Sequence, residues 1–306
     1  MTNTQEQQAA TAESAPAAAG PRPGRVALWV LGAAAVASLA GVFYSLYRLT
    51  GMADGLDDTG VVILANSLFS PIIVAMFAGA VASVIAVRLF KGPRQARVLF
   101  GALATGIATG VAGYLSFSAD SDIALVIGLI MLGSALVGGL FALPKNAVMV
   151  TAGLSATLLL LLLMYTRGIL QAASMKSLFS DPLDEYGTLG TAVPFIAGIA
   201  CGICAFLYLR QKKAGVKLLG HLLAGALAGA IWLVSTIIAQ IGVEVLLSVG
   251  VEAIDPFDVA TLALGFQWQY NGSMTAMFAG ALCAVFAYGF LLPKPAKAQS
   301  KAAKKS

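Results

Sequence analysis

Eight apolar runs of membrane-spanning length constrain the fold of this chain more than any other feature. A helix needs about 20 apolar residues to cross a hydrocarbon core of ~30 Å. The runs lie at 26–47, 61–87, 98–117, 123–143, 147–165, 188–209, 216–241 and 273–292. The sequence shows no alternating barrel pattern, and open strands cannot satisfy their backbone in lipid. We therefore predict an all-α polytopic membrane protein with about eight transmembrane helices.

The composition agrees with this class and excludes others. The 306 residues are 59% hydrophobic and 11% charged, whereas a soluble domain carries roughly 25% charged residues. That excludes a soluble enzyme, a disordered scaffold and a disulfide-stapled secreted module. The net charge of +5 comes from basic loops, as in membrane proteins. The bilayer is therefore the expected partner, and no nucleic acid is expected.

The loop charges predict the orientation. Most of the 19 Lys and Arg residues flank the runs on one side, as Arg94 and Lys212 do, and most of the 14 acids lie on the other, as Asp57 and Asp122 do. Basic loops stay in the cytoplasm. We expect a multi-pass protein of the cell membrane with both termini cytoplasmic.

Two halves of the chain resemble each other, which predicts an internal duplication. Residues 140–145 read LFALPK and residues 289–294 read GFLLPK. Proline and glycine positions also match in order: Pro71 with Pro194, Gly79 with Gly202, Gly101 with Gly220, Gly106 with Gly225, and Gly110 with Gly229. Because each half has four helices, the two repeats are parallel, related by an axis along the membrane normal.

The domain organisation follows from this duplication. Residues 1–24 form a predicted disordered tail, since their composition gives too little apolar surface to bury. Residues 25–145 form the first four-helix repeat. Residues 146–294 form the second, with an outer insertion at about 242–271, and residues 295–306 form a basic cytoplasmic tail.

The matched prolines are the first candidates for a substrate path. A proline inside a spanning helix removes a backbone hydrogen bond, and interrupted helices in both halves point to a central binding site. Pro71 and Pro194 are each preceded by polar residues: Asn66, Ser67 and Ser70 in the first half, Thr188 and Thr191 in the second. The alternative is a packing kink whose carbonyls are satisfied by these hydroxyls.

Gln240 and Glu244 are the second candidates. They lie four residues apart in a polar stripe on the seventh helix and therefore share a face. An acid near the membrane usually faces the bundle interior and has a partner, for which Arg48, Arg167 and Lys176 are available. The alternative is a solvated acid at a protruding helix end.

Six glycines predict close helix packing, because small residues let backbones approach in lipid. They are Gly101, Gly106, Gly110, Gly220, Gly225 and Gly229. Their positions indicate that the helices over 98–117 and 216–241 form the inner pair of the bundle.

No residue pattern indicates catalysis. Nucleotide, zinc and nucleophile motifs are absent from the sequence, and His221, Cys201 and Cys204 are interpreted as packing residues. We expect no catalytic residue, metal or cofactor. The leading hypothesis is a permease-like protein that moves a small or lipidic solute between two repeats. The alternative is a non-transporting subunit that binds other membrane subunits or a second copy of itself, and an intramembrane enzyme is the weakest hypothesis.

Overall fold

The computed structural model describes residues 24–52, 58–117, 121–172, 182–250 and 255–291, without the side chains of 48–52, 58–59, 167–172 and 182–189. These residues form helices and connecting turns, with no strand among them. The helices are α2 (Arg25–Met52), α3 (Asp58–Ser67), α4 (Phe69–Leu89), α5 (Arg94–Ser116), α6 (Ser121–Leu140), α7 (Ala147–Ala172), α8 (Pro182–Gln211), α9 (Leu218–Gly250) and α10 (Pro256–Leu291).

Eight spans within the described residues are long and apolar enough to cross a membrane. The prediction of an all-helical, multi-pass membrane protein is confirmed at this level. The helices α3 and α4 together make one span, interrupted at Leu68. The two predicted terminal segments, the tail at 1–24 and the basic tail at 295–306, lie outside the described residues except for Gly24. The cytoplasmic side of the termini stays a prediction.

The last span is longer than its sequence suggests. The helix α10 begins at Pro256 and not near residue 273. Pro256 occupies the first helical position, where a missing N–H costs nothing, and the Asp255 carboxylate accepts a hydrogen bond of 2.7 Å from the Phe257 N–H. The described parts of the expected insertion at 242–271 therefore belong to α9 and α10, apart from Asp255, which precedes α10.

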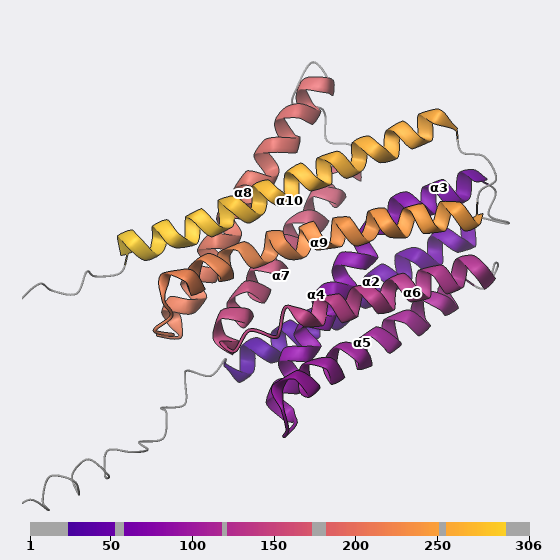
Figure 1. The fold of residues 1–306 in the computed structure, drawn as a ribbon. Helices are drawn as coiled ribbons and strands as arrows, with labels where there is room; N and C mark the ends of the chain where they lie inside the picture. The colour runs from indigo at the N-terminus through magenta and orange to yellow at the C-terminus, as the bar shows by residue number, and fades with distance from the viewer. Residues whose placement is uncertain (1–23, 53–57, 118–120, 173–181, 251–254, 292–306) are drawn as a thin grey trace, which may run out of the picture.

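The eight spans form one bundle with a continuous apolar core (Figure 1). The first half lies along one side and the second half along the other, with α9 between α10 and the first half. The helix α4 is at the centre, packed against α2, α5, α6, α7 and α9. The described start of α2 and the described end of α10 lie at the same end of the bundle.

The prediction that the helices over 98–117 and 216–241 form the inner pair of the bundle is wrong. The helix α5 packs on α4, α6 and α2, and it has no extensive contact with α9 among the described residues. Its other face leaves Leu103, Ile107 and Val111 exposed. The glycine spacing indicated that α5 has close neighbours, and these are α4 and α6, not α9.

The predicted packing glycines lie where backbones meet. A Cβ on Gly101 would be 2.7 Å from the Ala82 carbonyl oxygen of α4, and one on Gly106 or Gly110 would be about 3 Å from carbonyl oxygens of α6. In the second half, a Cβ on Gly225 or Gly229 would collide with the backbone of α10. Gly220 differs, because its neighbours are Val216 and the Met149 side chain.

Two arginines donate hydrogen bonds to the C-terminal ends of helices α4 and α6 in the first half. The Arg94 guanidinium donates to the carbonyl oxygens of Ala142 at 2.9 Å and Lys145 at 3.3 Å, and to that of Pro144. The Arg97 guanidinium donates to the carbonyl oxygens of Val87 and Phe90. These carbonyls lie in the last turn of α4 or directly after α4 and α6, where a helix has unpaired acceptors and favours a cation.

Candidate functional site

The two matched prolines lie in different surroundings. Pro71 is buried near the start of α4, directly after the break at Leu68. Pro194 lies inside α8 and is buried, and its ring carbon Cγ would be 3.2 Å from a Cβ built on Gly272 of α10. Neither proline lines any of the cavities described below, and a substrate path shared by the two prolines stays a prediction.

The polar residues before the prolines are also spread out. The Ser67 hydroxyl donates to the Leu64 carbonyl oxygen at 2.8 Å, which is the local satisfaction expected of a packing kink. Ser70 and Thr191 are exposed on α4 and α8. Thr188 lies in α8, but its side chain is outside the described residues. Asn66 is exposed on α3 and lines a small cavity formed with α9 and α10.

Gln240 and Glu244 do form a polar cluster, together with a residue that the sequence did not single out. The Gln240 amide nitrogen donates to the Glu244 carboxylate at 3.3 Å. The Tyr270 hydroxyl of α10 donates to the Gln240 amide oxygen at 2.9 Å. Glu244 is exposed, and the side chains of Arg48 and Arg167 lie outside the described residues, so the proposed ion pair stays a prediction.

A small polar cavity lies between α3, the start of α4, α9 and α10, and its lining includes Ala239 and Gln269, which precede Gln240 and Tyr270 in the chain. Its volume is about 20 Å³, and its polar lining comes from Asn66 and Gln269. A cavity needs about 10–15 Å³ of this kind of volume to hold one water, which also needs polar partners. The buried Gln269 amide oxygen has no hydrogen-bond partner among the described residues. The cavity is therefore the size and polarity of a single-water site.

Sequence reasoning missed Tyr270 and Gln269 because it placed them in an outer insertion. The signal was nevertheless present. The run Gln267-Trp268-Gln269-Tyr270-Asn271 places several hydrogen-bonding groups in an otherwise apolar helix, and such groups need partners when buried in a membrane bundle.

A larger cavity lies between the two halves. It has a volume of about 390 Å³ and is lined by α6 and the following turn on one side and by α7 and α9 on the other. The lining side chains include Phe141, Pro144, Met149, Leu227 and Ala230, and all of them are apolar. None of the predicted polar path residues lines it.

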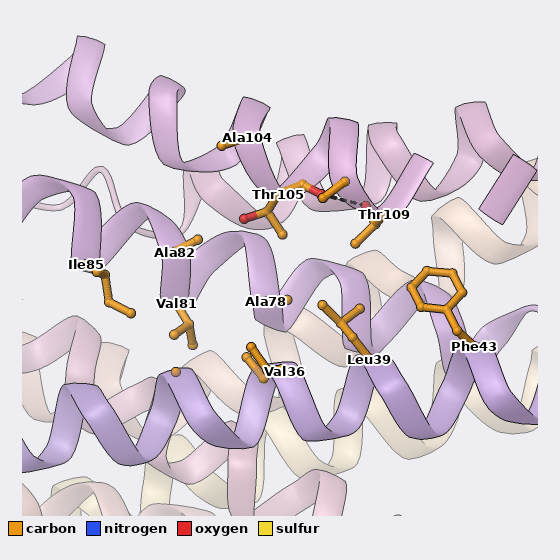
Figure 2. A pocket seen from close by; sticks show the side chains of 13 residues that line it. Val36, Leu39, Phe43, Ala78, Val81, Ala82, Ile85, Ala104, Thr105 and Thr109 are labelled. Atoms are coloured by element: carbon orange, nitrogen blue, oxygen red, sulfur yellow. Dashed lines mark hydrogen bonds between the residues drawn. The ribbon is translucent and has the colours of Figure 1, made fainter. Parts of the chain in front are cut away.

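A third opening is an apolar groove of about 440 Å³ between α2, α4 and α5. Figure 2 shows Val36 and Leu39 of α2 opposite Ala78 and Val81 of α4, with Thr105 and Thr109 above them on α5. The hydroxyls of both threonines donate to carbonyl oxygens of their own helix, at 3.0 Å and 2.9 Å. The groove therefore offers an apolar surface.

The residues interpreted as packing residues are half-buried or buried. His221 is buried between Phe206 and Tyr288, with ring centroids 5.8 Å and 4.7 Å away. The Cys201 thiol is buried and donates to the Ala156 carbonyl oxygen at 3.3 Å, and Cys204 is half-buried on the same helix. Within the described residues, no group of three metal-ligating side chains occurs.

Comparison of the chain with models of known families, with curated proteins and with solved structures finds no match. The site is therefore interpreted from its own geometry.

Proposed function

We propose that this membrane protein is permease-like and moves a lipidic solute between two helical repeats. The observation that carries the proposal is the cavity of about 390 Å³ to which both halves contribute. Ligand sites are concave and mostly apolar, and helical bundles place them between helices.

The lining favours a lipidic solute over an ion or a small polar solute. Every side chain around the cavity is apolar, and an ion in such surroundings loses its hydration without gaining a partner. The Gln240–Glu244–Tyr270 cluster lies on the α9–α10 side and does not line this space.

The packing scheme supports the parallel-repeat part of the proposal. The second helix of each half packs on the fourth, as α4 does on α6 and α8 on α10, and the third packs on the fourth, as α5 does on α6 and α9 on α10. The first helix of each half packs on the second. Transporters built from parallel repeats carry solutes at the repeat interface.

A second candidate function is a non-transporting membrane subunit. It is favoured by the close contact between the halves, where the Ser235 hydroxyl of α9 lies 3.0 Å from the Met76 sulfur of α4. In this alternative the chain binds other membrane subunits or a second copy of itself. Both candidates place the chain in the cell membrane with cytoplasmic termini, without a catalytic role or a cofactor.

Lipid movement in reconstituted vesicles tests the first candidate. The purified chain is placed in vesicles whose lipids carry a fluorescent headgroup, and a membrane-impermeant reductant then removes the signal of the outer leaflet. We expect faster loss of the inner-leaflet signal with the protein than without it. Ala230→Phe fills the cavity and should slow this loss, while Ala37→Phe, at an exposed position on α2, should not.

Two outcomes contradict the lipidic proposal. One is an unchanged rate in vesicles with and without the folded protein, which favours the subunit function. The other is equal activity of Ala230→Phe and Ala37→Phe when both retain the unmodified melting temperature. If Ala230→Phe does not fold, Leu227→Ala enlarges the same cavity and should keep activity.

Cysteine labelling separates a lipidic from a water-filled path. Single cysteines at Ser67, Ser70 and Thr191 are treated with a small water-soluble thiol reagent, with Ile63, exposed on α3, as the lipid-facing control. We expect the three sites to react no faster than the control. Fast reaction at all three, lost in Pro71→Ala and Pro194→Ala, would support a small polar solute instead.

A further inference from the structure

The helices α6 and α9 pack side by side across the two halves and form a seam that is closed at one end (Figure 1). A Cβ built on Gly242 of α9 would be 2.9 Å from the Ile130 Cδ1 atom of α6, and one on Gly250 would be 3.3 Å from the Ile123 Cδ1 atom. The contacts move toward the start of α6 as they move toward the end of α9, so the two helices are antiparallel.

The same two helix faces line the cavity between the halves at the other end of this seam. The next residue of the register on α9 is Val234, eight residues before Gly242, and the next on α6 is Val137, seven residues after Ile130. Val234 and Val137 both line the cavity. Residues about two turns apart share a helix face. The cavity is therefore the open continuation of a seam that closes at Gly242.

The depth of the cavity corresponds to one leaflet of a bilayer. Along α9 its lining runs from Leu223 to Val234, which is about 16 Å at 1.5 Å per residue. The hydrocarbon core is ~30 Å thick, so one leaflet takes about half of it. At the deep end, the Ser235 hydroxyl lies 3.0 Å from the Met76 sulfur of α4, and this contact joins the halves where the cavity stops.

The opening of the cavity lies at the surface of the bundle, between α6 and α9. Leu140 of α6 and Leu223 of α9 line the cavity and are exposed, whereas Met149 and Val150 of α7 line it and are buried. The buried pair forms the floor, and the exposed pair stands at the opening. In a membrane, an exposed apolar surface of this kind meets the acyl chains of the lipid.

The wall at the shallow end is held by hydrogen bonds. Phe141 and Pro144 line the cavity from the turn that follows α6. The Arg94 guanidinium donates to the carbonyl oxygens of Ala142 at 2.9 Å and Lys145 at 3.3 Å in the same turn. The cavity is therefore preformed, as ligand sites usually are.

We propose that the cavity binds one acyl chain of a membrane lipid, which enters sideways between α6 and α9 with its headgroup end near Pro144 and its methyl end near Val234. The volume of about 390 Å³ is at the small end of the range of about 300–1,000 Å³ for ligand pockets, which suits one chain and not two. The chain enters from a medium as apolar as the lining, and it gains the van der Waals contacts that an empty cavity lacks. The inference rests on the proposed function in one respect, because it takes this cavity as the substrate site.

Photo-crosslinking in vesicles tests where the chain lies. The full-length protein is reconstituted with phosphatidylcholine that carries a diazirine on one palmitoyl chain, near the headgroup in one probe and near the methyl end in the other. We expect the first probe to label Pro144 and Leu223, and tandem mass spectrometry locates the labelled residues. The second probe should label Val137 and Val234. Leu129, an exposed residue of α6, gives the background labelling by the surrounding lipid.

A free palmitic acid with the same diazirine distinguishes the sources of the chain. Stronger labelling of the cavity by phosphatidylcholine assigns the chain to a membrane phospholipid, and stronger labelling by the fatty acid assigns it to a single-chain amphiphile. Either result supports an acyl-chain site.

Filling the cavity tests the assignment of the label. Ala230→Phe should remove most of the labelling at Val234, whereas Ile237→Phe, at an exposed position of α9 outside the cavity lining, should leave it unchanged. The two variants are compared when both keep the unmodified melting temperature. If Ala230→Phe does not fold, the gradient of labelling from Leu223 to Val234 in the unmodified chain decides the question.

Three results would overturn the proposal. The first is labelling of the cavity lining that is no stronger than that of Leu129, and the second is equal labelling of Leu223 and Val234 by both probes. The third is labelling of Ile130 and Gly242, because the seam would then admit lipid through both leaflets.

The outcome is separable from that of the transport experiment. Labelling of the cavity without lipid movement in vesicles supports the acyl-chain site and contradicts the permease-like function. Lipid movement without labelling of the cavity supports transport and contradicts the acyl-chain site.

Discussion

The two halves of this bundle use equivalent helix pairs but hold them together differently. In the first half, α4 and α6 approach through glycines on both helices, since a Cβ on Gly79 or Gly138 would collide with the backbone of the other helix. The first half also has arginines that cap the ends of α4 and α6. The second half has longer third and fourth helices, with a tyrosine–glutamine hydrogen bond between them.

The difference shows two solutions to one physical problem. Apolar helices in lipid gain no hydrophobic free energy from associating, so close van der Waals packing and interhelical hydrogen bonds must hold them. The first half relies on backbone proximity and on charge at its helix ends. The second half adds contact length and polar side chains. The predictions below test this contrast, from the largest expected effect to the smallest.

Alanine at Gly79 should have the largest effect. Its Cβ meets the Ala135 backbone, which cannot move aside as a flexible side chain can. Overpacking costs typically 1–3 kcal/mol, and we expect the upper end, measured as the melting temperature in detergent. Gly202→Ala, the matched change in the second half, should cost less, because its Cβ would be 2.5 Å from the Gly280 carbonyl oxygen and the contact is less severe.

Gly133→Ala is the control for this comparison. Among the described residues, no atom outside the adjoining turns of its own helix lies within 4 Å of the added Cβ. Alanine is also the better helix former by roughly 0.5–1 kcal/mol. Equal melting temperatures for Gly79→Ala and Gly133→Ala would show that backbone proximity does not hold the first half together.

Removing the Arg94 guanidinium, which caps the end of α6, should cause the second largest loss of stability. Hydrogen bonds to a charged group contribute about 1.5–3 kcal/mol, and Arg94→Gln removes those to Ala142 and Lys145. Lysine cannot reproduce the fork of the guanidinium, so Arg94→Lys should rescue little. Amide hydrogen exchange over residues 138–146 should quicken, and the melting temperature should fall.

Lys213, before α9, stands at the corresponding place in the second half and is exposed. We expect Lys213→Gln to leave the rate of amide hydrogen exchange at the end of α10 unchanged. Equal losses of stability from Arg94→Gln and Lys213→Gln would remove the asymmetry between the halves.

The hydrogen bond between α9 and α10 should contribute less. Interhelical hydrogen bonds in membranes average about 0.6 kcal/mol in double-mutant cycles. Tyr270→Phe and Gln240→Leu, alone and combined, should therefore give a coupling of this size in equilibrium unfolding. Additive losses would mean that the bond of 2.9 Å does not stabilise the pair.

The contact between the halves should show the smallest effect. The Ser235 hydroxyl has one proton and donates to the Ile231 carbonyl oxygen at 2.7 Å within its own helix, so its contact with the Met76 sulfur is the weaker one. Ser235→Ala removes both contacts, but a serine bond to the preceding turn of its own helix adds no stability to that helix. We expect less than about 0.5 kcal/mol in the same unfolding measurement. If Ser235→Ala lowered the free energy of unfolding as much as Arg94→Gln does, the contact between the halves would be a main stabilising interaction of the bundle.

The candidate site shows where sequence reasoning ended. It placed Gln240 and Glu244 on one face of the same helix, where they are in contact, because helical spacing is local. It did not find Tyr270, whose place beside Gln240 depends on the packing of α10 against α9. It also grouped Pro71 with Pro194 by analogy of position, whereas the structure gives each proline different neighbours.

The sequence by itself determined the membrane class and the number of spans. Both follow from local quantities, because each span must be apolar over the thickness of a bilayer whatever its neighbours are. Only the tertiary structure decided that α4 and not α5 is central, that α10 begins at Pro256, and that cavities open between the halves and beside α2. In a uniformly apolar helix every face satisfies the membrane, so the face that meets another helix is chosen by shape and hydrogen bonding between segments distant in the chain.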